Sequence, residues 1–298
     1  MTTIGLTGGS SGFGAISLER FASSGARVFS GARAPSADAI PLDLTQLSSV
    51  RAFAECVRER LGESKLTSLV LNAGTIRGDD THRTVDGYET TFAANHLAHY
   101  LLLRLLMPSL GAGARIVLTT SGTHDPENHA GLVVPRHASA DLLAHPDRDD
   151  LNAASPREAG EHAYTASKLC GVLTVRSLNA HHDIRARHIS AIAFDPGQVF
   201  GTGLARGLSM PRRFAWSLLG TPLGTPLRTF VPTLNSRAAA GAALAKLALG
   251  AERCPGGASY AALRRGEIIW TDPSTMGRND DLARALWNDS ARLVGLPN

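Results

Sequence analysis

A glycine-rich turn near the start of the chain constrains the fold most, because it joins a short apolar run directly to an amphipathic stretch. Thr3–Leu6 is predicted to be a buried strand, and Phe13–Ser23 a helix that Gly25 ends. Such a turn aims backbone N–H groups and the positive end of the helix at a phosphate. The spacing T-G-x-x-x-G-x-G differs from G-x-G-x-x-G, so a tight turn without a ligand is the alternative for the motif alone. The turn consists of Thr7, Gly8, Gly9, Ser10, Ser11, Gly12, Phe13 and Gly14.

The same order of strand and then helix repeats along the chain. It predicts an α/β fold: a Rossmann-type, doubly wound parallel β-sheet with helices on both faces and right-handed crossovers. We expect residues 1–298 to form a single domain of this kind. The further predicted strands are Ala26–Ser30, Ala39–Leu42, Leu66–Leu71, Arg115–Thr119 and Ile189–Phe194, and the further helices are Leu47–Leu61, Thr90–Leu110 and Tyr164–His181.

Three stretches depart from this repeat. Arg33 and Leu42 are too close in sequence for a crossover helix, so a bare loop is expected between them. Residues 123–161 are a long polar insertion, which is typical of a functional or partly disordered loop. Residues 205–235 mix Pro and Gly with large apolar side chains, and we expect a substrate lid there, with contact to a membrane surface as the alternative.

The composition excludes several classes of protein. The formal net charge is +4, but the Lys and Arg residues are scattered, which argues against a nucleic-acid partner. Three widely spaced cysteines without a CxxC pair argue against a disulfide framework. The apolar run Leu97–Leu110 is broken by His99, Arg104 and Pro108, so no transmembrane segment is expected. The first strand leaves no room for a signal peptide, and we expect a cytoplasmic protein.

Tyr164 and Lys168 lie four residues apart on a predicted helix, which puts a phenol and an ammonium group on one face. A phenol ionises near pH 10, so it exchanges a proton at neutral pH only where its pKa is lowered. A neighbouring lysine and a cationic nicotinamide ring would have this effect. The pair therefore predicts hydride transfer, with Tyr164 as the general acid or base.

Arg33 follows the second predicted strand, where a dinucleotide-binding fold meets the adenosine ribose. An acidic residue there accepts a hydrogen bond from the ribose 2′-hydroxyl, whereas an arginine accommodates a 2′-phosphate. The preceding Gly31 and Ala32 offer no carboxylate. The cofactor is therefore predicted to be NADP(H), and a solvated arginine at a strand end is the alternative.

Two further groups follow strands, at the edge of the sheet where ligands bind. Asn72, Ala73 and Gly74 close the strand that ends at Leu71, although a simple turn is the alternative. Ser121 follows the strand that ends at Thr119, and its hydroxyl can donate to a substrate carbonyl oxygen as charge builds there. By position alone, Thr119 and Thr120 compete for this role.

No metal site is expected. His96 and His99 lie three residues apart on a helix, and five histidines fall between His124 and His162, but no HExxH sequence and no Cys/His set with zinc spacing occurs. Solvated or locally bonded imidazoles explain these residues. Cys170 is expected to be buried packing rather than a nucleophile.

Taken in order, these motifs resemble the short-chain dehydrogenase/reductase family over essentially the whole chain. Residues 91–100, 167–174 and 196–204 are similar to the branch that contains protochlorophyllide oxidoreductases and retinol dehydrogenases. The insertion before Tyr164 and the tail around Leu282–Leu296 favour the former. The matching motifs are Thr7–Gly14, Asp43-Leu44, Asn72-Ala73-Gly74, Asn95, Ser121, Tyr164-x-x-x-Lys168 and Pro196-Gly197.

The resemblance implies roles for these residues. Tyr164 is the general acid in reduction, Lys168 lowers its pKa and holds the nicotinamide ribose, and Ser121 polarises the carbonyl. Lowering a tyrosine pKa from about 10 to about 7 requires roughly 4 kcal/mol of differential stabilisation. The resemblance also implies that Asn95 positions Lys168 through a water, that Asp43 and Leu44 lie by the adenine, and that Pro196, Gly197, Val199 and Thr202 lie by the nicotinamide carboxamide.

The leading functional expectation is an NADP(H)-dependent oxidoreductase that acts on a ketone or an alcohol, and a homodimer or homotetramer is expected. Light-dependent reduction of a C=C bond in a tetrapyrrole is the second hypothesis. Gln198 counts against it, because protochlorophyllide oxidoreductases carry a cysteine there, near the substrate. A non-catalytic cofactor-binding protein is the third, and the intact set of Ser121, Tyr164 and Lys168 disfavours it.

Overall fold

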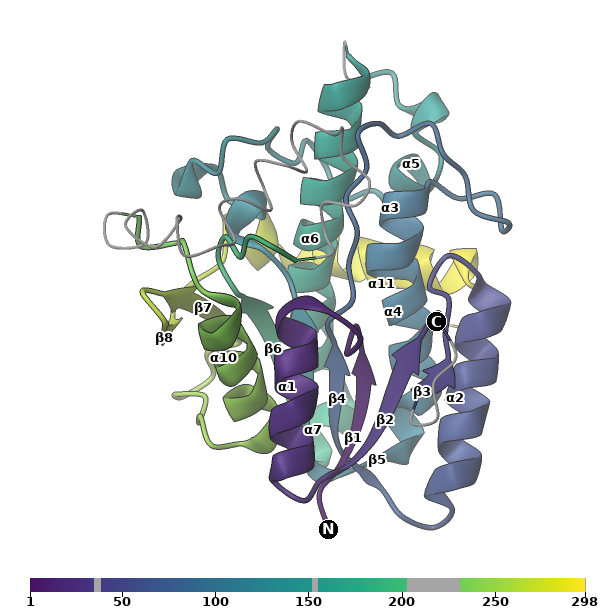
Figure 1. Cartoon of the computed structure of the whole chain (residues 1–298). Helices are drawn as coiled ribbons and strands as arrows, with labels where there is room; N and C mark the ends of the chain where they lie inside the picture. Colours follow the sequence, from purple (N-terminus) through teal and green to yellow (C-terminus); the bar gives the residue numbers. More distant parts are fainter. Residues whose placement is uncertain (35–38, 152–154, 203–230, 298) are drawn as a thin grey trace.

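The computed structural model describes residues 1–34, 39–151, 155–202 and 231–297, and an eight-stranded sheet between two layers of helices forms its centre (Figure 1). The strands are β1 Thr3–Thr7, β2 Arg27–Ala32, β3 Ala39–Pro41, β4 Leu66–Leu71, β5 Leu110–Thr119, β6 Ser190–Asp195, β7 Tyr260–Arg264 and β8 Glu267–Trp270. Their order is β3-β2-β1-β4-β5-β6-β7-β8, and all neighbours are parallel except β7 and β8. The predicted α/β class with a doubly wound sheet is confirmed.

The last strand is a departure from the expected parallel sheet. Arg264 pairs with Glu267, so Arg265 and Gly266 alone form the turn, with φ angles of 51° and 79°. Two positive φ angles give a two-residue turn the twist that an antiparallel hairpin needs. Neither β7 nor β8 was predicted from the sequence.

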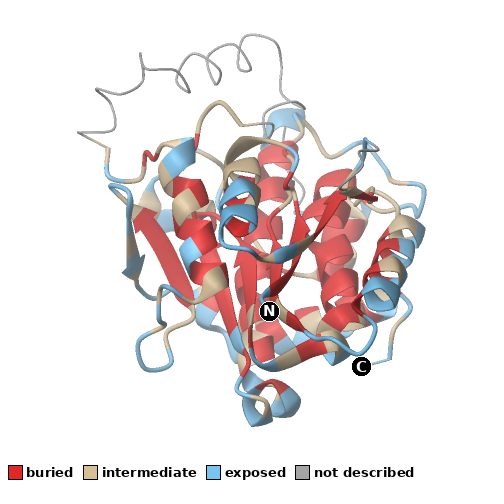
Figure 2. Cartoon of the chain, turned by 60° about the horizontal axis from the view of Figure 1, so that its bottom comes forward, coloured by how far each residue is buried: buried red, intermediate tan, exposed pale blue. Residues whose placement is uncertain are grey.

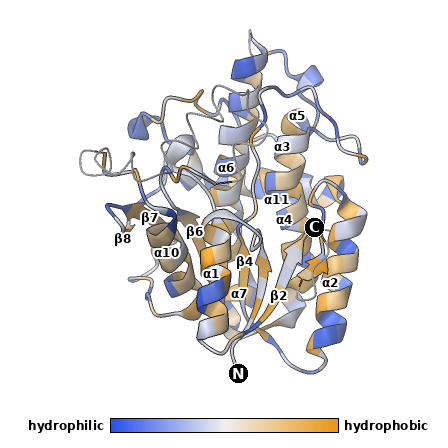
Figure 3. Ribbon diagram, viewed as in Figure 1, coloured by the Kyte–Doolittle hydropathy of each residue, from blue (hydrophilic) through white to orange (hydrophobic). Residues whose placement is uncertain are grey.

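Helices cover both faces of the sheet, and each face has its own apolar core. Phe21 and Phe194 belong to one core, and Phe53, Tyr100 and Leu169 belong to the other. The central strands and the helix surfaces that face them are largely buried, whereas the edge strand β8 is partly exposed (Figure 2). α2 carries apolar and polar residues on different sides (Figure 3). α1 Gly12–Ser23 and α10 Arg237–Leu249 cover the first face, and α2 Leu47–Leu61, α4 Ala98–Leu106, α6 Pro156–Ala180 and α11 Asp280–Leu293 cover the second.

The helix predicted over Thr90–Leu110 is interrupted. It consists of α3 Thr90–Phe92, a π-helical turn at Ala93–Leu97 and α4, and β5 then begins at Leu110 rather than at Arg115. The Glu89 carboxylate caps its start by accepting hydrogen bonds from the backbone N–H groups of Thr91 and Phe92 at 2.7 and 2.6 Å. A π-helical turn adds one residue to the helix without ending it, and such turns are frequent at functional sites.

The helix that carries Tyr164 begins earlier than predicted. α6 starts at Pro156, where the Ser155 hydroxyl accepts a hydrogen bond from the backbone N–H of Glu158 at 3.3 Å. Serine at the cap, proline in the first turn and glutamate at the third position are a regular helix start. The end of the predicted insertion is therefore the first part of α6. The rest of it contains short helical turns, including α5 Ala140–Ala144, and α7 His182–Ala186 follows α6.

Most of the predicted lid lies outside the described residues, which resume at residue 231. Gln198 and Leu234 form an isolated parallel bridge, so the chain on either side of that segment is paired at its base. Among the helices that the structure describes, none is long and apolar enough to cross a membrane.

Candidate active site

A cavity of about 810 Å³ opens over the carboxyl ends of β1, β4, β5 and β6. Its position is the point where the strand order reverses between β1 and β4, which is where open α/β sheets bind ligands. Every site residue that the sequence analysis proposed lines this cavity except Asn95. Segments that are far apart in the sequence therefore meet at a single site.

The glycine-rich turn lines the cavity beyond the end of β1 and is closely packed. A Cβ atom on Gly14 would lie 2.1 Å from the Gly8 carbonyl oxygen, and one on Gly8, which has a φ of +75°, would lie 2.8 Å from the Ala73 backbone. Ser11 is the N-cap of α1 but makes no side-chain capping bond. The first N–H groups of α1 are thus left for a ligand, and the turn fits the pyrophosphate of a dinucleotide.

Thr7 lines the cavity, but its hydroxyl is fully used within the protein. Its oxygen accepts hydrogen bonds from the backbone N–H groups of Asn72 and Ala73 at 2.9 and 3.1 Å, and it contacts His99 Nε2 at 3.0 Å. With both acceptor positions occupied, the hydroxyl proton must go to His99 Nε2. His99 Nδ1 therefore carries the ring proton and donates it to the Asn95 carbonyl oxygen at 3.1 Å.

Burial lowers the pKa of His99 to about 4, and the nearby Lys168 charge contributes to this shift. The ring is thus neutral and links the glycine-rich turn to the π-helical turn. The expectation that His96 and His99 are locally bonded rather than metal ligands is consistent with these contacts, and His96 bonds to Ser290 at 2.8 Å. Nothing in the sequence pattern indicated the contact between Thr7 and His99, because 92 residues separate them.

Asn72 ties two walls of the site together. Its side-chain N–H donates to the Gly8 carbonyl oxygen at 3.3 Å, and its side-chain oxygen accepts from the Thr119 hydroxyl at 3.0 Å. Thr119, one of the competitors for the role of Ser121, is therefore engaged inside the protein. Thr120 is engaged as well, since its hydroxyl donates to the Lys168 carbonyl oxygen at 2.7 Å.

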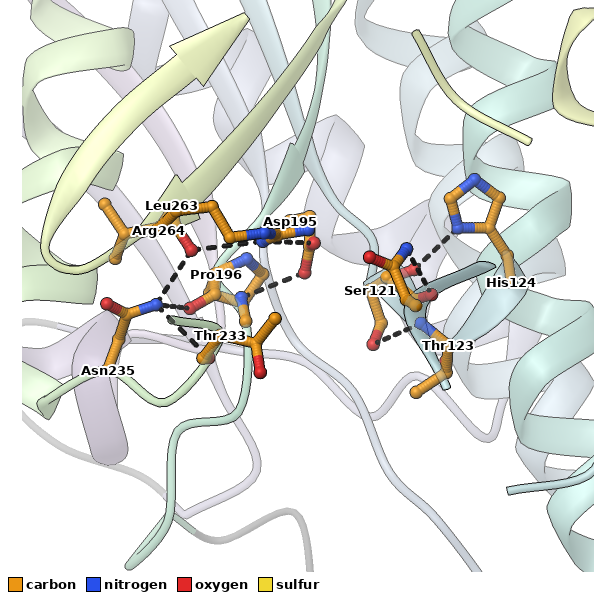
Figure 4. A network of polar contacts seen from close by, with 12 residues as sticks. Ser121, Thr123, His124, Asp195, Pro196, Thr233, Asn235, Leu263 and Arg264 are labelled. Carbon is orange, nitrogen blue, oxygen red and sulfur yellow. Dashed lines mark hydrogen bonds and ion pairs between the residues drawn. The ribbon is translucent and has the colours of Figure 1, made fainter. Parts of the chain in front are cut away.

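Ser121, Tyr164 and Lys168 come together beside the sheet edge. Ser121 lies two residues after the end of β5, and its hydroxyl oxygen accepts a hydrogen bond from the Thr123 backbone N–H at 3.3 Å (Figure 4). Tyr164 and Lys168 project from one face of α6, each about 6% exposed, with Lys168 Nζ 5.7 Å from the centroid of the Tyr164 ring. Lys168 Nζ also donates to the Thr119 carbonyl oxygen at 3.2 Å.

The predicted lowering of the Tyr164 pKa involves both Lys168 and a nicotinamide ring, and in the chain by itself this pKa lies above its ordinary value. Burial raises the pKa of Tyr164 to about 12; a hydrogen bond from Ser121 lowers it in part, and the Asp195 charge raises it again. Burial also lowers the pKa of Lys168 to about 8, while Asp195 acts in the opposite direction. In the chain itself, desolvation therefore outweighs the attraction between phenolate and ammonium.

Asn95 lies in the π-helical turn, outside the lining of the cavity. Its side-chain N–H groups donate to the Thr75 carbonyl oxygen at 2.9 Å and to the Ser167 hydroxyl at 3.0 Å, and its side-chain oxygen accepts from the Thr75 N–H at 2.8 Å. The amide thus holds the residue next to Lys168 and the chain after Gly74. A role for Asn95 through a bound water stays a prediction.

A buried carboxylate that was not predicted from the sequence, Asp195, lies near Tyr164 and Lys168, and Figure 4 shows its own contacts. Asp195, the last residue of β6, accepts from the Gly197 N–H at 2.9 Å and forms an ion pair with Arg264 of β7 at 2.9 Å. Asn235 fixes the next residue, since its side chain donates to the carbonyl oxygens of Pro196 and Leu263 at 3.1 and 2.9 Å. Only the position of Asp195 before Pro196 hinted at this arrangement.

Arg33 and Asp43 line the cavity just beyond the ends of β2 and β3. The Asp43 carboxylate accepts hydrogen bonds from the N–H and hydroxyl of Thr45 at 2.9 and 2.8 Å. Arg33 makes no hydrogen bond or ion pair with any other described residue, so its guanidinium is available for an anionic ligand. The remaining lining residues of the predicted set are Ser10, Gly12, Phe13, Leu44, Gly74, Val199 and Thr202. In the ranges that the structure covers, no group of His, Cys, Asp or Glu could hold a metal ion.

Comparison with known proteins identifies the family. Residues 2–131 match the family model described as short chain dehydrogenase. Human retinol dehydrogenase 13 is 31% identical over 257 residues, which cover 86% of this chain and 68% of that protein. The chain belongs to the short-chain dehydrogenase/reductase family.

Other members of the short-chain dehydrogenase/reductase family show the same relation. Chloroplastic protochlorophyllide reductase A of Triticum aestivum is 30% identical over 270 residues, covering 86% of this chain and 66% of that protein. The chain thus spans about two thirds of the length of these two relatives. The solved structure of an NADPH-bound carbonyl reductase from chicken fatty liver has the same fold, with a TM-score of 0.57, 18% identity, and coverage of 91% of this chain and 99% of that one.

Proposed function

We propose that this short-chain dehydrogenase/reductase is an NADP(H)-dependent enzyme that transfers hydride between the nicotinamide and a carbonyl or alcohol substrate. The observation that carries the proposal is the meeting of Ser121, Tyr164 and Lys168 in the same cavity as the glycine-rich turn. An acid, a hydrogen-bond donor and a cation thus lie beside a site that fits a dinucleotide.

In the reductive direction, Tyr164 holds the proton that the substrate needs. Its pKa of about 12 keeps the phenol protonated at neutral pH, so it can donate to a carbonyl oxygen. The Ser121 hydroxyl donates a second hydrogen bond to the same oxygen as negative charge develops there. NADPH, when bound, supplies the hydride for the carbonyl carbon. Lys168 stabilises the phenolate that remains on Tyr164 and binds the nicotinamide ribose.

Arg33 supports a preference for NADPH over NADH. Its side chain lines the adenosine end of the cavity without a partner among the described residues, and Gly31 and Ala32 before it carry no carboxylate. The nearest acid in that part of the lining, Asp43, is already bonded to Thr45. A cation without a competing acid favours a 2′-phosphate over a 2′-hydroxyl.

A fluorescence titration with NADPH and NADH tests the cofactor assignment. We expect tighter binding of NADPH, and loss of this preference in Arg33→Ala. Arg20→Ala is the matched control, because Arg20 is an exposed arginine of α1 outside the cavity. Equal affinities in the unmodified protein would exclude this role for Arg33. If neither cofactor binds, the proposal that the protein is a nicotinamide-dependent enzyme is wrong.

Turnover tests the catalytic assignment. NADPH oxidation is followed with a panel of aliphatic and aromatic ketones and retinal, and Tyr164→Phe is expected to lower kcat roughly 100-fold or more with little change in NADPH affinity. Tyr88→Phe is the control, since the Tyr88 hydroxyl donates to the Leu293 carbonyl oxygen away from the cavity. Full turnover by Tyr164→Phe would exclude Tyr164 as the acid.

The similarity to protochlorophyllide reductase A favours one second candidate, reduction of a C=C bond in a tetrapyrrole. Mixing the protein with NADPH and protochlorophyllide and then illuminating it tests this candidate. A red shift of the pigment absorption on binding, followed by conversion in the light, would support it. An unchanged spectrum would rule it out.

A further inference from the structure

The part of the cavity beyond Tyr164 has a charged lining. Arg157 and Glu161 precede Tyr164 by seven and three residues on α6, so the three side chains lie along one side of the helix. Arg77 enters the same lining from the chain that follows Asn72, Ala73 and Gly74. This half of the cavity is where a substrate that receives the Tyr164 proton has to extend.

Two of these three charges neutralise each other. Arg157 Nε lies 2.7 Å from Glu161 Oε1, and the Glu161 side chain is only 9% exposed. The other oxygen of Glu161 accepts a hydrogen bond from the Val133 backbone at 3.4 Å. The pair is thus tied to both α6 and the insertion, and it contributes little net charge to the cavity.

Arg77 lacks such a partner. Its guanidinium makes no hydrogen bond or ion pair with any described residue, and its Nε is buried without an acceptor. Buried polar groups in proteins are nearly always hydrogen bonded, and a charged donor without an acceptor is costly. Arg77 is therefore the unbalanced charge in this half of the described lining.

The backbone of Arg77 is held in place close to the catalytic helix. A Cβ atom on Gly160 would lie 2.8 Å from the Arg77 carbonyl oxygen and 2.6 Å from the Asp79 nitrogen, so α6 packs tightly on this stretch. Gly160 precedes Tyr164 by one helical turn, about 6 Å along the axis at 1.5 Å per residue. The other end of the same segment, Ala73, lies against Gly8 of the glycine-rich turn. Arg77 is thus at the end of the segment that is remote from the cofactor turn.

We propose that Arg77 binds an anionic group, a carboxylate, on the carbonyl substrate. This inference rests on the proposed function, because it places the substrate carbonyl at Tyr164. Guanidinium and carboxylate match in geometry and form paired, charge-assisted hydrogen bonds, which would satisfy the buried Nε. The substrate class is therefore an oxo acid in which the carboxylate lies several bonds from the carbonyl.

A matched pair of ketones tests the proposal. The probes are 4-acetylbenzoate and 4-acetylbenzamide, which have the same shape and differ in charge. Their binding to the NADPH complex is measured by calorimetry for the unmodified protein, for Arg77→Gln and for Arg185→Gln, an exposed arginine of α7. We expect the carboxylate to bind roughly 10- to 100-fold tighter than the amide, with the preference lost only in Arg77→Gln.

Each other result overturns the assignment. A carboxylate preference that survives in Arg77→Gln would mean that another group binds the anion, and equal or absent binding of both probes would exclude an anion site. Loss of NADPH affinity in Arg77→Gln would mean that Arg77 binds the cofactor instead of the substrate. The same titration without NADPH separates this inference from the proposed function. If the protein binds no cofactor but still binds the carboxylate through Arg77, the proposed function fails and the anion site stands.

Discussion

Replacing Thr7 by valine removes one hydroxyl that links β1 to two other segments, the chain after β4 and α4. Valine keeps the shape and β-branching of threonine, so β1 and its packing are preserved. The Thr7 hydroxyl is buried, with the residue 1% exposed, and it is the shared partner of the Asn72 N–H, the Ala73 N–H and His99 Nε2. The substitution therefore leaves three polar groups without this partner.

The magnitude follows from these contacts. A buried polar group without a partner costs about 1–3 kcal/mol, so three such groups give a destabilisation of at least about 3 kcal/mol. Thr7→Ser is the matched control, because it keeps the hydroxyl and loses one methyl group, at about 1 kcal/mol. If Thr7→Val is much less stable than Thr7→Ser, the loss of stability comes from the hydrogen bonds rather than from packing.

Urea unfolding followed by circular dichroism at pH 7.5 measures both variants, and NADPH titration measures the site. At this pH His99 is neutral and can accept the hydroxyl proton, because its pKa is lowered to about 4. We expect Thr7→Val to bind NADPH more weakly as well, since Ala73 packs directly on Gly8. If Thr7→Val were as stable as Thr7→Ser, the assignment of the His99 proton and of the shared hydroxyl would be wrong.

Three further perturbations have defined outcomes. Asp195→Asn removes the negative charge that raises the pKa of both Tyr164 and Lys168, so the pH at which alcohol oxidation reaches half its maximal rate should fall; an unmoved pH profile would contradict this. Burial lowers the pKa of His96 to about 3, of His99 to about 4 and of His162 to about 3, so their contribution to stability is complete above pH 6.5 and is lost as the pH falls toward 4. Up to three protons are then taken up on unfolding, so the free energy of unfolding changes by about 4 kcal/mol per pH unit near pH 5. Urea unfolding at several pH values measures this slope, and His96→Gln should remove about a third of it. Gly14→Ala places a methyl group 2.1 Å from the Gly8 carbonyl oxygen, so NADPH affinity should fall at least tenfold, and an unchanged titration would show that the turn can widen freely.

The sequence predicts those elements well whose pattern is local. Leu66–Leu71 has the predicted bounds because its apolar residues are followed directly by the turn signal Asn72-Ala73-Gly74. The π-helical turn at Ala93–Leu97 was missed because one extra residue hardly disturbs an apolar pattern. The start of α6 was missed because the polar composition of the insertion outweighed the cap signal in Ser155, Pro156 and Glu158.

The site residues show the same difference between local patterns, which the sequence reveals, and long-range contacts, which it does not. The motif residues that line the cavity were predicted because each follows a strand or shares a helix face, and both properties are readable along the chain. Asp195 and Arg264 are 69 residues apart, and only the pairing of β6 with β7 brings them together. The direction of the Tyr164 pKa was also out of reach, because spacing gives its neighbours but not the depth of its burial.

The π-helical turn makes the number of residues in this stretch part of the design of the site. Each residue of a helix advances its side chains by about 100°. A π-helical turn takes up one extra residue, so deleting one residue between Ala93 and Leu97 would restore a regular α-helix and leave α4 in the same phase. A second deletion has no such extra residue to remove and would turn α4 by about 100° relative to α3. His99 would then point away from Thr7, and Tyr100 would lose the Trp287 carbonyl oxygen that its hydroxyl contacts at 2.9 Å. The loss of one residue here should therefore be tolerated better than the loss of two, because only the second changes the direction of every later side chain of α4.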